Sequence, residues 1–160
     1  MAAIIFRLLA LVLLIGGITP AFAGSDKNGK FVVIERVVSP GGVIAWLVSD
    51  TSIPIISMRF AFRGGASLDP AGREGLADMT SALLDEGAGD LDSQAYQRRL
   101  QDLSIALHFS AERDTFTGTL KTLTKNRDQA FNLLRLALSK PRFDDEPVDR
   151  IRSQLLSGLR

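Results

Sequence analysis

Cysteine is absent from the 160-residue sequence, and histidine, tryptophan and tyrosine occur once each. Without cysteine the chain can form no disulfide, thiolate zinc site or thiol redox site. The single histidine, His108, cannot supply a histidine-rich metal site or a Cys–His pair. No charge sign dominates either, because 19 Lys and Arg residues oppose 18 Asp and Glu residues. Nucleic-acid and anionic-lipid binding proteins usually concentrate positive charge, so neither partner is indicated.

The N-terminal apolar run, residues 8–18, is too short for a membrane-spanning helix, which needs about 20 apolar residues. Arg7 precedes this run, and Ala21-Phe22-Ala23 follows it as an A-x-A cleavage site. This layout is typical of a secretory signal peptide. We predict that cleavage between Ala23 and Gly24 removes residues 1–23. The protein is then periplasmic or secreted, has no membrane anchor, and carries 18 basic (19 − Arg7) and 18 acidic groups.

After a flexible polar lead-in at 24–30, the sequence predicts one domain over residues 31–160. Met58, Phe60 and Phe62 alternate with Arg and Ala, which is the two-residue period of a half-buried strand. The expected strands lie at 31–38, 43–50, 53–65, 105–112 and 115–123, with a Ser-Pro-Gly-Gly turn at 39–42 and a hairpin turn at 113–114. Ser93 is a plausible N-cap of a helix.

The expected helices lie at 73–86, from Ser93 to 103, at 126–140 and from about 144 to 160. The element order predicts an α+β fold, an antiparallel or mixed sheet with helices packed on one face. The last helix keeps its apolar period up to residue 160 without a stop signal. We therefore expect the domain to continue beyond that residue.

Residues that could carry chemistry are few. Ser67 and Ser81 lack a G-x-S-x-G elbow, and the glycines at 64–75 match neither phosphate-binding motif. His108 is predicted on the strand face opposite the apolar residues, as a surface or interface residue. The acidic residues of 85–92 do not follow a calcium-loop spacing, which predicts a solvated helix end. They are Asp85, Glu86, Asp90 and Asp92.

The stretch 60–89 resembles the N-terminal signature region of the insulinase/pitrilysin family of zinc peptidases. That family carries an "RGGS"-like strand end, a "DP-x-G-x-x-GLAH" turn and helix start, and the inverted zinc motif H-x-x-E-H. The run "RGG…DP-x-G-x-E-GLA" is specific, and similarity extends over nearly all of 31–160. The motif residues matched here are Arg63, Gly64, Gly65, Asp69, Pro70, Gly72 and Gly75.

The departure from the family lies at the reactive positions. Asp78 stands at the first histidine position, Ser81 at the glutamate position and Ala82 at the second histidine position. The family's third ligand is a glutamate on a later helix, and no glutamate follows Glu146. Catalytic zinc normally needs three protein ligands, and a serine hydroxyl is not basic enough to deprotonate zinc-bound water. The resemblance therefore implies a chain without catalytic residues or cofactor, with zinc expected in a catalytic homologue.

We interpret the sequence as an exported, non-catalytic homologue that acts as a partner subunit or as the peptide-binding half of an insulinase-like peptidase. The resemblance implies a catalytic homologue or a peptide as partner. The strand at 58–65 is an edge to which an extended peptide can add. Two alternatives stay open. One is part of an active zinc metalloendopeptidase whose catalytic residues lie outside this sequence, and the other is a stand-alone periplasmic binding module.

Overall fold

The computed structural model describes residues 24–25 and 31–159. The predicted signal peptide, with Ala23 at its end, lies outside the described residues. The chain divides into two compact units, Met1–Ser52 and Ile53–Arg160. In the described residues no helix combines the length and the apolar character needed to cross a membrane.

Two antiparallel strand pairs make up the described part of the first unit. Strand β1 (Gly24–Ser25) pairs with β2 (Phe31–Val32), so two residues of the predicted lead-in form a strand. Strand β3 (Ile34–Val38) pairs with β4 (Ile44–Val48), with Ile34 opposite Val48. The turn between them is closed by the Gly42 N–H, which donates to the Ser39 carbonyl at 2.9 Å. The hairpin predicted around residues 39–42 is confirmed.

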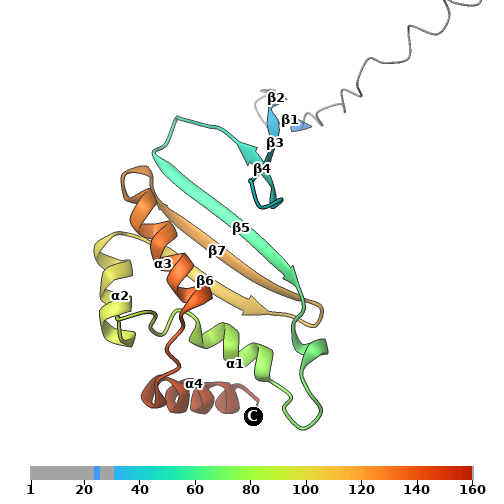
Figure 1. Ribbon diagram of the computed structural model, residues 1–160, viewed down its shortest axis with the longest axis vertical. Coiled ribbons are helices and arrows are strands. Elements are labelled where there is room, and N and C mark those ends of the chain that lie inside the picture. The colour runs from blue at the N-terminus through green and yellow to red at the C-terminus, as the bar shows by residue number, and fades with distance from the viewer. Residues whose placement is uncertain (1–23, 26–30, 160) are drawn as a thin grey trace, which may run out of the picture. The chain divides into compact units, whose positions relative to one another are not determined.

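The second unit is built on a three-stranded antiparallel sheet in the order β5-β7-β6 (Figure 1). Its strands are β5 (Ile55–Arg63), β6 (Ala106–Ala111) and β7 (Thr115–Leu123). The short 3-10 helices η2 (Ala66–Leu68) and η3 (Thr124–Asn126) follow β5 and β7. Four α-helices complete the unit: α1 (Leu76–Leu83), α2 (Ser93–Asp102), α3 (Arg127–Ser139) and α4 (Asp145–Gly158). The predicted α+β fold class is confirmed.

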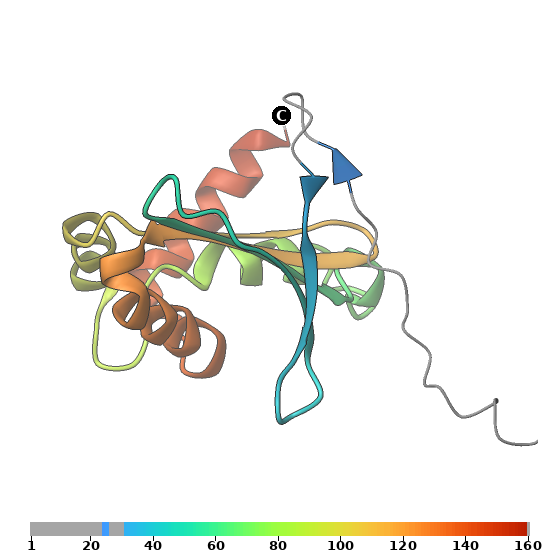
Figure 2. The ribbon, with the colours of Figure 1, turned by 90° about the horizontal axis from the view of Figure 1, so that it is seen from above.

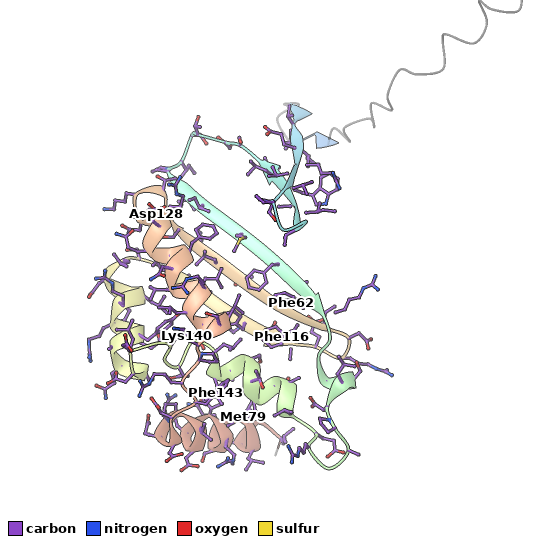
Figure 3. All side chains as sticks on the ribbon, viewed as in Figure 1. Phe62, Met79, Phe116, Asp128, Lys140 and Phe143 are labelled. Atoms are coloured by element: carbon purple, nitrogen blue, oxygen red, sulfur yellow. The ribbon has the colours of Figure 1, made fainter. Side chains whose placement is uncertain are left out.

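One face of this sheet forms the core with α2 and α3. Helix α3 buries Ala130, Leu133, Leu134 and Ala137, which follow the i, i+3, i+4, i+7 spacing of one helix face. The strands contribute alternate side chains, and each large apolar side chain buried here stabilises the fold by about 1.5–3 kcal/mol. The apolar core residues of the strands are Leu107, Phe109 and Leu120, with Met58, Phe60 and Phe116 packed beside them (Phe116 is labelled in Figure 3).

Gly118 allows the aromatic side chains of the sheet to meet across its central strand. It lies opposite both Phe60 of β5 and Phe109 of β6. The two rings pack edge to face with centroids 6.4 Å apart. A Cβ atom at position 118 would come within 2.1 Å of Phe60 Cζ, so only glycine fits beneath the ring.

Helices α1 and α4 form a second layer beside β6. Helix α1 contacts both β6 and α4. Figure 1 shows α4 next to α1 at the border of the sheet, and Figure 2 shows α4 rising from near the level of the strands in the direction away from α3. Arg150 of α4 pairs with Glu86 just after α1, with 2.6 Å between nitrogen and oxygen. Ser93, at the start of α2, donates its hydroxyl to the same Glu86 carboxylate at 2.6 Å.

Two predicted helix boundaries are wrong. The helix expected from 73 to 86 spans only Leu76–Leu83, because Gly75 has a left-handed conformation with φ 90° and cannot belong to the helix. The N-cap of α2 is Asp92 rather than Ser93, since the Asp92 carboxylate accepts from the Ala95 N–H at 2.8 Å.

Candidate functional site

The candidate site lies at the turn between β5 and α1, where the sequence motif runs from Arg63 to Ala82. Two glycines end the strand and turn the chain toward the β6–β7 hairpin. The Gly64 N–H donates to the Asp114 carbonyl at 3.1 Å, and the Ala66 N–H donates to the Glu112 carbonyl at 2.9 Å. These two hydrogen bonds attach the first part of the motif to the tip of the β6–β7 hairpin.

Gly65 permits the close approach of these two segments. Its φ of 112° lies in the region that favours glycine. A Cβ atom there would lie 2.1 Å from the Glu112 carbonyl oxygen and 3.0 Å from that of Thr115. The second glycine of the motif is thus required by backbone packing.

Asp69 holds the N-terminus of α1 from outside the helix. Its carboxylate accepts from the Gly75 N–H at 2.8 Å and from the Ala77 N–H at 2.9 Å. The first N–H groups of a helix have no partner within the helix, and a carboxylate also interacts favourably with the positive end of the helix dipole. The sequence marked Asp69-Pro70 only as a turn, so this capping role is new.

Glu74 supports the same turn at its surface. Its carboxylate accepts from the Gly72 N–H at 3.0 Å, and this backbone hydrogen bond lowers the pKa of Glu74. Gly72, with φ 78°, and Gly75 take the positive φ values that the turn requires. The predicted structural motif therefore lies together in one connected turn.

The family's reactive positions lie on α1 and do not form a metal site. Asp78 is exposed, Ser81 is buried and Ala82 is partly buried. The Ser81 hydroxyl donates to the Asp78 backbone carbonyl at 2.8 Å, so its hydrogen bond is made within α1. A carboxylate, an engaged hydroxyl and a methyl group do not provide the ligands or the base that zinc hydrolysis uses. Among the described residues, no group of three or more His, Cys, Asp and Glu side chains is placed to hold a metal ion.

The prediction of a solvated helix end after α1 is wrong for two of its four acidic residues, Asp85 and Glu86, which are partly buried, whereas Asp90 and Asp92 are exposed. Burial is the main cause that raises the pKa of Asp85. The Glu86 side chain is only 14% exposed. Burial alone would raise its pKa, but hydrogen bonds from Arg150 and Ser93 outweigh burial and lower it.

His108 lies where the sequence placed it. It is exposed on β6 between the buried residues Leu107 and Phe109. Ser67 is exposed in η2, and its backbone N–H donates to the Arg113 carbonyl at 2.8 Å. The structure brings neither residue together with the reactive positions of α1 in any hydrogen bond.

The structure thus contains a sheet bordered by α1, a glycine turn that is hydrogen-bonded to a hairpin, and a carboxylate that caps α1. Solved structures of insulinase/pitrilysin-type, or M16, proteins share this fold. The peptidase M16 inactive domain from Pseudomonas fluorescens superposes with a TM-score of 0.71 and 26% identity, over 78% of this chain and 31% of that one. A protease from Helicobacter pylori shares the fold with a TM-score of 0.60 and 16% identity, over 72% of this chain and 28% of that one.

A curated sequence relative points to the same class. The non-peptidase homolog YmxG of Helicobacter pylori (strain ATCC 700392 / 26695) is 28% identical over 107 residues, which are 67% of this chain and 25% of that protein. No protein-family model matches the chain. The resemblance to the insulinase/pitrilysin-type, or M16, family is confirmed, and the findings support a non-catalytic M16-type member. The chain spans between a quarter and a third of the length of these relatives.

Proposed function

We propose that this chain is the non-catalytic half of an M16-type peptidase assembly, and that it associates with a catalytic homologue or holds its peptide substrate. One observation carries the proposal. The turn from Gly64 to Asp69 keeps its full hydrogen bonding, while Asp78, Ser81 and Ala82 occupy the reactive positions. A scaffold that is complete around an incomplete reactive site suits a role in binding.

The relatives give this proposal further support. One is named a non-peptidase homologue and another an inactive domain. Strand β5 is an outer strand of its three-stranded sheet, the position at which an extended peptide can add by backbone hydrogen bonds. The outer position of β5 in the sheet of the second unit is thus compatible with peptide binding.

Co-expression of the complete reading frame with an H-x-x-E-H homologue tests the proposal. We expect the two proteins to elute together at micromolar concentration, because a stable interface buries more than about 1,000 Å². We also expect peptidase activity to rise over that of the homologue alone. A homologue whose motif glutamate is replaced by glutamine controls for activity that comes from this chain. If the homologue is fully active alone and the proteins elute separately, the partner role is refuted and a stand-alone binding module is favoured.

We further propose that the protein is exported to the periplasm or secreted after cleavage between Ala23 and Gly24. The proposal is supported by the Arg7, apolar run and A-x-A order of residues 1–23. Mass spectrometry of the exported protein should find Gly24 as the N-terminus. An intact Met1 on a membrane-embedded product would contradict export with cleavage.

A further inference from the structure

The sheet of the second unit has one core face and one outer face, and the outer face is basic. Side chains alternate along the strands, so the residues that do not join the core share the opposite face. We call this surface the outer sheet face. It comprises Ile55, Ser57, Arg59, Ala61 and Arg63 of β5, Ala106, His108 and Ser110 of β6, and Thr115, Thr117, Thr119, Lys121 and Leu123 of β7.

Three cations on this face are exposed, and two of them are neighbours. Arg59 lies opposite Thr119, so Lys121, two residues further along β7, is its diagonal neighbour. Diagonal neighbours on adjacent strands lie about 7–8 Å apart. Arg63 lies four residues beyond Arg59 on the same face, about 13 Å along the strand. All three side chains are exposed.

No acidic group within the sheet balances these cations. Strands β5, β6 and β7 contain no Asp or Glu. In the portion of the chain that the structure describes, Arg59, Arg63 and Lys121 form no ion pair. Two carboxylates of α4 are already paired within that helix. Glu146 pairs with Arg150, and Asp149 pairs with Arg152.

We propose that the outer sheet face binds an acidic polypeptide segment. The inference rests on the peptide-binding role proposed above and specifies the class of peptide. Arg59 and Lys121 together offer one site for a carboxylate, and Arg63 offers a second. An extended peptide rises about 3.3 Å per residue, so acidic residues four positions apart match the distance between the two sites.

The neighbouring side chains also suit this occupant. Ser57 and Thr119 flank the first site and carry hydroxyls that can donate to a carboxylate. No aromatic residue lies on the outer sheet face, whereas proteins that bind single-stranded nucleic acids combine positive charge with aromatic side chains on which the bases stack. The face therefore favours an acidic peptide over a nucleic acid.

Fluorescence anisotropy with the complete chain tests the inference. The probe is an extended peptide with two glutamates four residues apart and an uncharged dye, and its matched control carries glutamines at those positions. The variant R59Q/R63Q/K121Q removes the cations of the outer sheet face. The control variant R73Q/R99Q/K125Q removes three exposed cations that lie outside the sheet. Circular dichroism confirms that both variants are folded.

We expect the glutamate peptide to bind the wild type and the control variant equally. Loss of the three cations should weaken binding by at least about tenfold, and added salt should weaken wild-type binding because exposed charges are screened. The inference is overturned if the glutamine peptide binds as tightly, if the two variants behave alike, or if a single-stranded oligothymidylate binds at least as tightly. Equal binding of both peptides leaves the peptide-binding role intact. Absence of any peptide binding refutes the inference, whereas the partner role depends on the co-elution experiment.

Discussion

Asp69 links the two halves of the signature motif, since its carboxylate binds N–H groups of Gly75 and Ala77 at the start of α1. We predict that Asp69→Ala lowers the free energy of unfolding by about 2 kcal/mol, because it leaves two partly buried donors without an acceptor. Urea denaturation measures the change. Glu74→Ala is the matched control, since it removes one exposed hydrogen bond to Gly72, and it should cost less than about 1 kcal/mol. Equal costs for the two substitutions would contradict the capping role.

Gly65 and Gly72 provide a second comparison at single residues. Both have positive φ, but a Cβ atom at Gly65 would meet the Glu112 carbonyl, whereas nothing lies within 4 Å of one at Gly72. We predict that Gly72→Ala costs about 1–2 kcal/mol of unfolding free energy through backbone strain alone. Gly65→Ala should cost about 1–3 kcal/mol more, because it adds a steric clash. Thermal unfolding measures both, and a smaller loss at Gly65 would show that the turn is not packed against the hairpin.

Residue roles such as these could be predicted only in part. The sequence identified the glycines and Asp69 as turn residues, because glycine and Asp-Pro are strong local signals. It did not identify Asp69 as a cap, because its partners lie six and eight residues away and meet it only after the turn has folded. The Asp78, Ser81 and Ala82 replacements needed no structure, since they follow from the order of residues in the motif.

At the scale of elements, the ion pair of Glu86 and Arg150 joins the segment just after α1 to α4. Hydrogen bonds from Arg150 and Ser93 lower the pKa of Glu86 below its usual 4.5. A lowered pKa means that the ionised form is stabilised in the folded state. This stabilisation is complete above the unfolded pKa and is lost as pH falls through the folded pKa.

Glu86→Gln tests this linkage. At pH 7 the substitution should cost about 1 kcal/mol of unfolding free energy, a modest value because Arg150 is 38% exposed. The difference between wild type and variant should shrink as pH falls from about 4.5 through the lowered pKa of folded Glu86, since Glu86 is then progressively protonated in the unfolded and the folded state. Asp85, whose raised pKa acts in the opposite direction, is present in both proteins and largely cancels in this difference. A difference that stays constant from pH 7 to about pH 3 would exclude a role for the charge.

Element types followed from periodicity more reliably than element ends did. The apolar spacing of α3 and the alternation of β5 and β7 depend on which face is buried, so the sequence shows them directly. The start of α1 was misplaced because Gly75 looks like a helix residue in sequence but has a left-handed backbone. Glu86 and Arg150 are 64 residues apart, and local patterns do not indicate such a pair.

At the scale of the whole molecule, the account describes a peptidase scaffold whose ligand positions no longer suit zinc. The sequence showed the alternating pattern of β5, but only the sheet register shows that Arg59 is a diagonal neighbour of Lys121 rather than of an acidic residue. The basic outer sheet face and the residues at the reactive positions both support our proposal that the chain binds peptides and does not cleave them. This central proposal predicts that the wild-type chain does not bind zinc tightly.

Isothermal titration of the complete chain with zinc is the most direct test of this claim. We predict no stoichiometric binding by the wild type and an unchanged result for Asp78→Ala. As a positive control, Asp78→His/Ala82→His places two imidazoles four residues apart on one helix face, the arrangement that zinc sites use, and should gain measurable binding. A single submicromolar site in the wild type that is lost in Asp78→Ala would contradict the account.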